Sequence, residues 1–324
     1  MRAVKGVVIT IDADLIVVGL GVGVEFVAGR LADAGGQFVR GRATVTGSRT
    51  VVVGGQDFRA SRGLVLATGP QPAVPPVDGL AGTPYWTNHE ALEAREAQAS
   101  VTVAGGGAVG VELAQAFARF GTAVTIVEAA DRLLPAEEPE AGELIGEVLR
   151  REGIHVLIRT RLWRVSHDGR DLRCTLGGAG PVHSQHLLVA TGRHADLKAL
   201  GVGAAGIDDT KPFMAVDDFL RAADGGWSAG DVTGAGAFTH VAILQARMAA
   251  SDILGQAHEP ASYRALPRVT FTDPEVGAVG LTEAQARGRK SPCRLFASPG
   301  LASCDGQDLT SHERAEGSRR NEAT

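Results

Sequence analysis

The sequence predicts an α/β protein with two related domains of parallel sheet, and three observations support this prediction. The chain has 324 residues, enough for two or more hydrophobic cores. It contains 43 glycines, well above ordinary usage, as expected where many tight turns bring the backbone close to a ligand. Two segments, residues 14–35 and 100–121, share one design, in which β-branched residues precede clustered glycines and a helical pattern that ends at glycine.

The first segment lies near the start of the chain. Residues 1–21 are apolar enough to be mistaken for a secretion signal, but Asp12 and Asp14 interrupt them and glycines follow, so we interpret them as a buried strand. Residues 37–53 then alternate as short strands, and no strand ending in an acidic residue comes between them and the first helix. The first domain is therefore predicted to be internally shortened.

The second segment begins a longer alternation of strands and helices. The chain continues with a strand from Ala123 to Val127, a charged helix from about Glu140 to Glu152 and a short strand from His155 to Ile158. This order predicts parallel strands joined by right-handed crossovers.

Each half also contains an antiparallel meander that leads to a strand ending in Ala-Thr-Gly, at Thr68 and Gly69 in the first half and at Gly192 in the second. Residues 69–80 are proline-rich and are interpreted as a linker. We predict a first domain formed by residues 1–78 and 201–258, and a second formed by residues 79–200. Residues 287–324 lack apolar periodicity and are predicted to be disordered.

Composition excludes several classes of protein. The net charge of −5 and the lack of a basic block argue against a nucleic-acid partner. Cys174, Cys293 and Cys304 form neither a metal-ligand pattern nor a disulfide framework, which favours a reducing cytoplasm. No stretch reaches the roughly 18–20 apolar residues of a membrane span.

The second glycine cluster matches G-x-G-x-x-G between a predicted strand and a predicted helix. It consists of Gly105, Gly106, Gly107, Ala108, Val109 and Gly110. Glu128 ends the next strand, near the spacing at which an acid bonds the adenosine ribose, and its carboxylate would repel a 2′-phosphate. These residues predict an NAD site with NADH preferred over NADPH. The alternative is a structural glycine turn with a surface glutamate.

The first glycine cluster is a weaker match to the same pattern. Gly19, Gly21 and Gly23 allow a flexible turn, but Val24 stands where the last glycine is expected. Phosphates can rest on such a turn, yet the ribose has lost its acidic partner. A purely structural remnant is therefore the alternative interpretation.

Six motifs in order resemble the flavin-dependent pyridine nucleotide-disulfide oxidoreductases, the family of dihydrolipoamide dehydrogenase, mercuric reductase and glutathione reductase. They are VVGLGVG near the start, LVLATG at 64–69, VAGGGAVGVELA at 103–114, LLVATGR at 187–193, and the segments 227–250 and 267–286. The resemblance implies two Rossmann-like FAD/NAD(P)-binding domains in three layers, the first discontinuous and shortened. It also implies that residues 259–286 are the remnant of a C-terminal α+β dimerisation domain.

The resemblance further implies particular cofactor contacts. Gly230 and Asp231 are expected to hold the ribityl-phosphate region of FAD, and Glu112 is expected to lie near the nicotinamide. Residues beside the isoalloxazine ring are expected to be Ala237, Phe238, Thr239 and His240. His240 is equally well explained as a packing histidine, and Glu112 as a solvated helix residue.

Two departures from the family limit what can be inferred about function. The CxxxxC redox pair is absent, and His312 with Glu313 does not match the surroundings of the family's His-Glu pair. We predict a flavoprotein oxidoreductase that passes hydride from NADH to FAD without a usable disulfide, and we name no catalytic side chain and no electron acceptor. The alternative is a non-catalytic remnant that binds only NAD(H). Missing strands also predict poor solubility or self-association, although most of the expected homodimer surface is absent.

Overall fold

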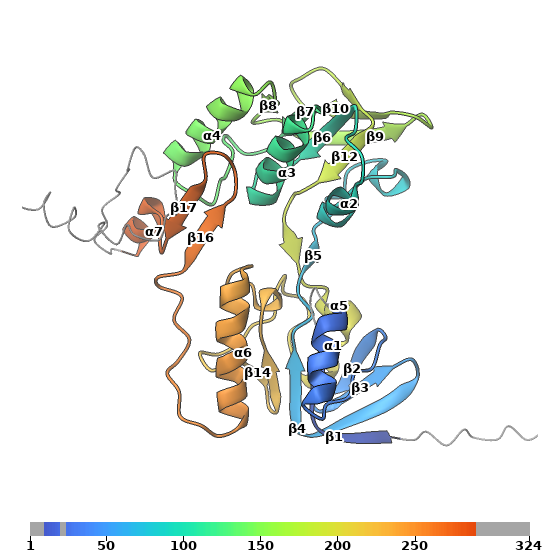
Figure 1. Ribbon diagram of the computed structural model, residues 1–324, viewed down its shortest axis with the longest axis vertical. Helices are drawn as coiled ribbons and strands as arrows, with labels where there is room; N and C mark the ends of the chain where they lie inside the picture. Colours follow the sequence, from blue (N-terminus) through green and yellow to red (C-terminus); the bar gives the residue numbers. More distant parts are fainter. Residues whose placement is uncertain (1–9, 20–23, 290–324) are drawn as a thin grey trace, which may run out of the picture.

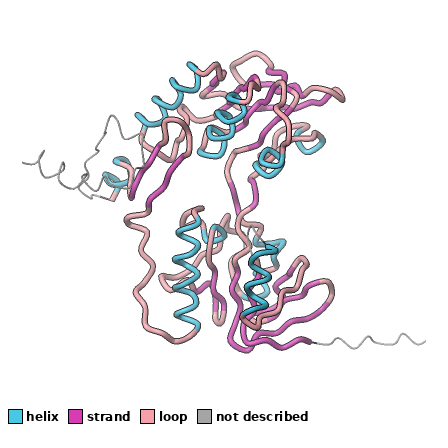
Figure 2. The backbone as a smooth tube through the Cα atoms, viewed as in Figure 1, coloured by secondary structure: helices cyan, strands magenta, loops and turns pink. Residues whose placement is uncertain are grey.

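A computed structural model of the chain describes residues 10–19 and 24–289, with the backbone alone for 24–28. Figure 1 shows two lobes joined at a narrow waist. Residues 10–69 and 195–258 form the first lobe, and residues 77–192 form the second. Helices and sheets occur together in both lobes (Figure 2), which confirms the predicted α/β class.

The sheet of the first lobe is built around one long strand, β4 (Gln56–Leu66). Strand β1 (Thr10–Val18) runs parallel to β4 along its whole length. The other edge of β4 pairs first with β3 (Thr50–Val53) and then with β15 (Gly226–Ser228). Strands β2 (Ala43–Gly47) and β14 (Arg221–Ala223) complete the sheet.

One buried cluster forms the main core of this lobe, with Leu64 and Leu66 of β4 at its centre. Its helices are α1 (Val24–Asp33), α5 (Leu197–Leu200) and α6 (Thr239–Ile253), with 3-10 turns at Val202–Ala205 and Asp231–Thr233. Leu197 also packs in this core, although it falls within residues 79–200, the predicted range of the other domain.

The second lobe has a parallel sheet with strand order β12-β6-β7-β8. These strands span His186–Val189, Ser100–Ala104, Ala123–Val127 and His155–Leu157. One face packs on the helices α3 (Ala108–Arg119) and α4 (Pro139–Arg151), and α2 (Asn88–Glu93) lies near β12. The other face packs on a meander of β9 (Leu162–His167), β10 (Leu172–Leu176) and β11 (Val182–Ser184). The three predicted layers are therefore present.

The chain crosses between the lobes through two short paired strands. Strand β5 (Gln71–Pro72) is antiparallel to β13 (Arg193–His194). Strand β5 lies inside the predicted linker, and a 3-10 turn at Leu80–Gly82 begins at the last residue of that linker. Each crossing follows an Ala-Thr-Gly segment, so both segments lie near the waist (Figure 1).

A C-terminal hairpin packs beside the second lobe. It consists of β16 (Pro267–Thr270) and β17 (Val276–Val279), followed by α7 (Glu283–Gly288). The hairpin lies next to α3 and α4 in Figure 1. The tail predicted to be disordered falls outside the described residues, apart from its first few positions, which form the end of α7.

Two expectations from the sequence are wrong. Strand β1 was predicted to be buried, yet most of it is exposed, including Ile11 at 40% and Val17 at 54%. It is exposed because, among the residues described, only β4 pairs with it. In addition, residues 37–42 form no strand, and pairing starts at Ala43. Over the described ranges, no helix is long and apolar enough to cross a membrane.

Candidate functional site

In the turn between β6 and α3, two glycines lie against backbone atoms and a third has open space beside it. Gly105 has φ +112°, and a Cβ there would lie 2.3 Å from the carbonyl oxygen of Ala190. A Cβ on Gly110 would lie 2.0 Å from the carbonyl oxygen of Gly105. A Cβ on Gly107 would meet no atom within 4 Å. The middle glycine therefore keeps space clear in front of the helix, where a diphosphate fits.

The amino terminus of α3 provides donors for that space. Gly107 is the N-cap, and no side chain caps the helix. Because the first amides of a helix have no intrahelical partner and carry the positive end of its dipole, they favour an anion. The residues Ala108 and Val109 follow the cap directly and supply such amides.

Glu128 stands beside this turn, at the end of β7. Its Oε2 accepts a hydrogen bond from the Gly106 amide at 2.6 Å, and its Oε1 accepts one from the Ala130 amide at 2.6 Å. The Gly105 amide donates to the carbonyl of Val127 at 2.9 Å, which ties the turn to β7. A carboxylate has about four acceptor positions, so capacity for ribose hydroxyls remains.

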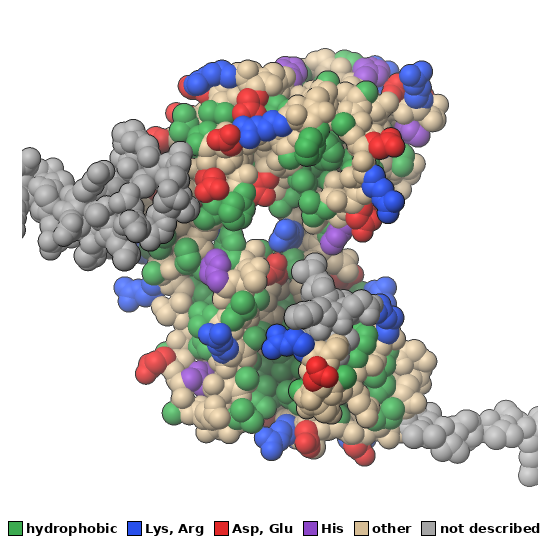
Figure 3. All heavy atoms as spheres, in the orientation of Figure 1, with side chains coloured by type: hydrophobic (Ala, Val, Ile, Leu, Met, Phe, Trp, Pro, Cys, Tyr) green, Lys and Arg blue, Asp and Glu red, His purple; other side chains and the backbone are tan. Residues whose placement is uncertain are grey.

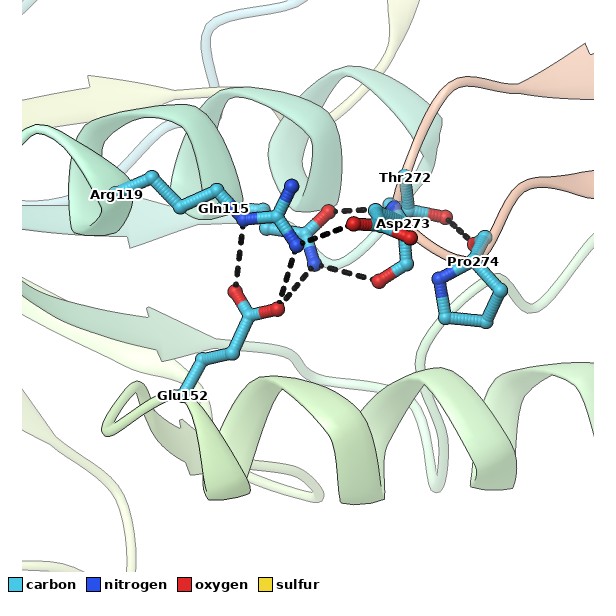
Figure 4. Close-up of polar contacts among 6 residues, drawn as sticks. All are labelled: Gln115, Arg119, Glu152, Thr272, Asp273 and Pro274. Atoms are coloured by element: carbon cyan, nitrogen blue, oxygen red, sulfur yellow. Dashed lines mark hydrogen bonds and ion pairs between the residues drawn. The ribbon is translucent and has the colours of Figure 1, made fainter. Parts of the chain in front are cut away.

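Glu112 makes a contact that the sequence did not indicate. Its Oε1 accepts a hydrogen bond of 2.8 Å from the amide of Phe271, in the loop between β16 and β17. Further along α3, Gln115 exchanges two hydrogen bonds with the backbone of Asp273, at 2.8 and 2.9 Å. Arg119 joins the Asp273 carboxylate to Glu152 (Figure 4). One face of α3 therefore holds the C-terminal hairpin.

The first glycine turn repeats part of this geometry. Gly19 has φ +103°, and its Cβ would lie 2.3 Å from the carbonyl oxygen of Ala67. The Ala67 amide donates to Val18 at 2.7 Å, just as the Ala190 amide donates to Ala104 in the second lobe. Gly21 and Gly23 lie outside the described residues, so the remainder of this turn stays a prediction.

The Gly230–Asp231 loop is held by a residue that the sequence patterns did not single out. Gln245 of α6 is fully buried, and its Oε1 accepts a hydrogen bond of 2.6 Å from the Gly230 amide. Its amide nitrogen donates to the hydroxyls of Thr233 and Tyr263. A glutamine on the apolar face of a helix was the available signal, because a buried amide side chain requires partners.

Asp231 is half-buried and weakly paired. Its nearest cation is Arg193 of β13, with 3.4 Å between Nη1 and Oδ2. Burial raises the pKa of the Asp231 carboxyl above its ordinary value, and the charge of Arg193 opposes this only in part. The carboxylate can accept a hydrogen bond from a ligand hydroxyl.

The remaining predicted contacts lie near the waist. Helix α6 begins there (Figure 1), and its exposed His240 stacks on Phe238 with 5.4 Å between ring centroids. Ala237, Thr239 and Thr68 are exposed. Gly69 and Gly192 have positive φ, and a Cβ on either glycine would meet no atom within 4 Å. Figure 3 shows a gap between the lobes at this level. The cofactor roles of these residues remain predictions.

Thiol and metal chemistry find little support in the described part of the chain. Cys174 is buried in the core between the sheet and the meander, and burial raises its pKa to about 11. No group of His, Cys, Asp and Glu side chains in the described ranges could hold a metal ion. Cys293, Cys304, His312 and Glu313 fall outside those ranges.

Comparison with known proteins agrees with this geometry. Residues 20–246 match the family described as pyridine nucleotide-disulphide oxidoreductase. A mercuric reductase from Streptomyces lividans is 38% identical over 263 residues, covering 78% of this chain and 55% of the relative. A dihydrolipoyl dehydrogenase from Chlorobaculum parvum is 36% identical over 298 residues, covering 88% of this chain and 63% of the relative.

Solved structures show the same relationship. The HOCl-induced flavoprotein disulfide reductase RclA from Escherichia coli superposes with a TM-score of 0.76 at 29% identity, covering 89% of this chain and 68% of that one. LpdA from Mycobacterium tuberculosis has the same fold, with a TM-score of 0.75 at 24% identity and with 91% and 65% covered. The chain spans about half the length of the curated relatives that it matches. By its motifs, its fold and its matched residues, the chain belongs to the pyridine nucleotide-disulphide oxidoreductase family.

Proposed function

We propose that this protein is an NADH-oxidising flavoprotein that lacks a dithiol step. NADH would bind at the turn between β6 and α3, and FAD would bind at the end of β4 in the first lobe. The observation that carries the proposal is the Glu128 carboxylate, which accepts the Gly106 amide and so lies at the glycine turn. An acid in this position binds ribose hydroxyls and repels a 2′-phosphate.

The second turn fits a nicotinamide dinucleotide. Space in front of Gly107 is open, and the uncapped amides of α3 face that space. The diphosphate would lie on these amides, and the adenosine ribose beside Glu128. The preference for NADH over NADPH depends on that one carboxylate.

The first lobe fits only part of FAD. Asp231 is half-buried and has a single ion-pair contact, 3.4 Å long, with Arg193, so it would accept a ribityl hydroxyl. Gly19 keeps the turn close to the end of β4. The adenosine end has no acidic partner comparable to Glu128 on a described strand beside β1. We therefore expect weaker FAD binding than in a complete domain of this type.

The side chains would act by binding and orientation. When bound, nicotinamide and flavin supply the hydride donor and the hydride acceptor. Glu128 and the α3 amides would fix one dinucleotide, and Asp231 with Gln245 would fix the loop that meets the other. No side chain is required to move a proton in this scheme, so the protein contributes alignment and exclusion of water.

A disulfide step is left out because suitable sulfurs are missing. The sequence has three cysteines, none of them in a CxxxxC pair. Cys174 is buried, and its raised pKa keeps the sulfur protonated and unreactive. Electrons from a reduced flavin would instead pass to a small-molecule acceptor.

The proposal is tested by titrating NADH and NADPH into the purified chain. We expect NADH to bind more tightly than NADPH. Glu128→Gln should weaken NADH binding about 10-fold to 100-fold, because a charge-assisted hydrogen bond is lost. The same replacement should reduce the difference in affinity between NADH and NADPH. Equal binding of both dinucleotides before and after the change would overturn the assignment of Glu128.

A second measurement tests the redox step. Protein loaded with FAD should be yellow, and NADH should bleach it under nitrogen. A colourless protein that still binds NADH would favour the second candidate function, a nucleotide-binding protein without flavin chemistry. The exposed β1 supports this second candidate, because the first lobe offers fewer contacts to a dinucleotide than the second.

A further inference from the structure

The lobes are connected at the waist and also by a second route. At the waist, β5 and β13 pair over only two residues each. The second route is the segment of residues 254–271, which leaves the end of α6 in the first lobe and enters β16 beside the second lobe (Figure 1). We call this segment the strap. Residues 254–266 of the strap contain no helix or strand, so its side-chain and backbone contacts decide how firmly it is held.

The strap is anchored on the first lobe at Tyr263. The hydroxyl of this half-buried side chain accepts a hydrogen bond of 2.8 Å from Nε2 of Gln245. The same glutamine accepts the Gly230 amide at 2.6 Å and so holds the Gly230–Asp231 loop. Leu266 lies against a neighbouring loop, because a Cβ built on Gly236 would be 3.0 Å from its Cδ2 atom. The strap therefore contacts the two loops of the first lobe in which flavin contacts are predicted.

The other end of the strap is anchored on the second lobe. The Phe271 amide donates a hydrogen bond of 2.8 Å to Oε1 of Glu112, on α3. Gln115 of the same helix holds the turn that follows through two backbone hydrogen bonds (Figure 4). Within the strap, Nε of Arg268 contacts both carboxylate oxygens of Glu137, at 2.7 and 3.0 Å. These two side chains are only 18% and 13% exposed, and separating such a pair leaves a poorly solvated charge.

Hydride transfer between the lobes would depend on how far apart they are held. Each nucleotide would be bound by one lobe, so the reacting atoms meet only at one separation of the lobes. A misplacement of about 1 Å can slow such a reaction about 100-fold. Domains hinge at short connections of a few residues, so the two-residue strands of the waist do not fix this separation by themselves.

We infer that the strap fixes the distance between the two nucleotide sites, with Tyr263 and Phe271 as positioning residues at its two anchors. This inference rests on the proposed function and adds the element that aligns its two cofactors. Residues 264–270 are the whole length of chain between the anchors, and most of them already belong to the extended β16 or lead directly into it. When the lobes move apart by more than the slack of that short stretch, an anchoring contact must break.

The experiment lengthens the strap between its anchors in the FAD-loaded full chain. Gly-Ser-Gly-Ser inserted between the exposed residues Arg264 and Ala265 adds up to about 13 Å of reach and leaves every anchoring side chain in place. We expect the reduction of flavin at saturating NADH to slow at least about tenfold. The dissociation constants of NADH and FAD should stay within about threefold, because neither site is altered. Tyr263→Phe, which removes one anchoring hydroxyl, should slow the reduction by a smaller factor.

A second readout does not depend on flavin chemistry. Spin labels attached through Ser48→Cys in the first lobe and Leu92→Cys in the second, both at exposed positions, report the distance between the lobes. Cys293→Ser and Cys304→Ser remove the other thiols except Cys174, which is buried. We expect the longer strap to broaden the distribution of this distance.

The matched control is the same insertion between Gly178 and Ala179, in an exposed turn of the second lobe. It should alter neither the rate of flavin reduction nor the distance distribution. An unchanged rate or an unchanged distribution with the longer strap would overturn the inference, and so would an equal effect of the control insertion. No reduction of flavin in the unaltered chain would overturn the proposed redox step, and the distance distribution alone would then decide for or against the strap.

Discussion

The strands that lead into the two glycine turns have similar sequences and very different surroundings. Val17 and Val103 each stand two residues before the first glycine of their turn. The side chain of Val17 is 54% exposed, whereas Val103 is fully buried. Strand β6 has β12 and β7 as neighbours and α3 on one face, while β1 pairs only with β4 in the described part of the chain.

The turns themselves differ less than the strands. Gly19 lies against Ala67 as closely as Gly105 lies against Ala190, with 2.3 Å to the carbonyl oxygen from a Cβ built on either glycine. Each turn is therefore shaped by its own Ala-Thr-Gly strand, which both lobes retain. Burial of the strand and the acidic partner come from the next strand in the sheet, which, among the described residues, only the second lobe has. A glycine turn therefore forms against its Ala-Thr-Gly strand alone, but it needs the next strand and the acid at its end to hold a dinucleotide.

The largest expected effect distinguishes two glycines of the second turn. Gly110→Ala would place a Cβ 2.0 Å from a backbone oxygen, so we expect loss of NADH binding and a loss of stability of about 3 kcal/mol or more. Gly107→Ala meets no neighbour within 4 Å, so the unfolding temperature should stay unchanged while NADH binds at least about tenfold more weakly. Thermal unfolding and NADH titration measure both. Equal destabilisation by the two variants would contradict this division of roles.

The next effect tests burial of the strands directly. Val103→Ala should destabilise the protein by about 2 kcal/mol, because buried methyl groups are lost and a cavity remains. Val17→Ala, the matched change in β1, should cost less than about 0.5 kcal/mol at its exposed position. Chemical denaturation measures both values. Similar losses would show that β1 is covered in solution, for example by self-association, and lowering the protein concentration would then reduce the cost at Val17.

A smaller effect concerns the acid on α3. The second turn carries Glu112 seven residues after its first glycine, whereas the first turn has Phe26 at that distance. We expect Glu112→Ala to weaken NADH binding about 3-fold to 10-fold. It should leave ADP-ribose binding unchanged, because ADP-ribose lacks the nicotinamide. The loss of the bond to Phe271 should also lower stability by about 1 kcal/mol. If NADH and ADP-ribose were weakened equally, Glu112 would serve only to hold the hairpin.

Much of the fold was predictable because local patterns and neighbours agree. Strand β7 has the predicted limits, Ala123 to Val127, and α4 lies within one residue of its predicted ends. The exposure of β1 was not predictable from its own residues, because an apolar strand is buried only when other strands and helices cover it. The short interval between the first helix and the meander indicated that a neighbouring strand is missing there, and in the described part of the chain β1 is exposed because only β4 pairs with it.

The sites were predictable to a similar degree. The packing of Gly105 and Gly110 and the position of Glu128 follow from motif spacing, and the structure brings these residues together. Gln245 was missed because its partners, Gly230 and Tyr263, are distant in sequence and become neighbours only when α6 packs. The contact of Glu112 with Phe271 was missed for the same reason, since it joins residues 159 positions apart.

The smallest expected effect is a pH-dependent gain of stability at the flavin end of the first lobe. Burial raises the folded-state pKa of Asp231 above its ordinary value of 3.8, so the folded protein favours the protonated carboxyl. When the folded-state pKa of a carboxyl is raised, its contribution to the free energy of unfolding is most favourable below the unfolded-state pKa. That contribution is lost as the pH rises through the folded-state pKa.

Asp231→Asn should therefore stabilise the protein by up to about 1 kcal/mol at pH 7 and have no effect near pH 3. Thermal unfolding between pH 3 and pH 7 measures this change in stability. Asp208→Asn is the control: hydrogen bonds from Thr210 lower the pKa of the Asp208 carboxyl, so its replacement should change stability in the opposite direction. A carboxylate that costs stability, in a loop whose neighbouring Gly230 amide is held by the buried Gln245, is expected of a ligand site and not of a structural ion pair. Destabilisation by Asp231→Asn at pH 7 would instead make the pair with Arg193 the reason for its position.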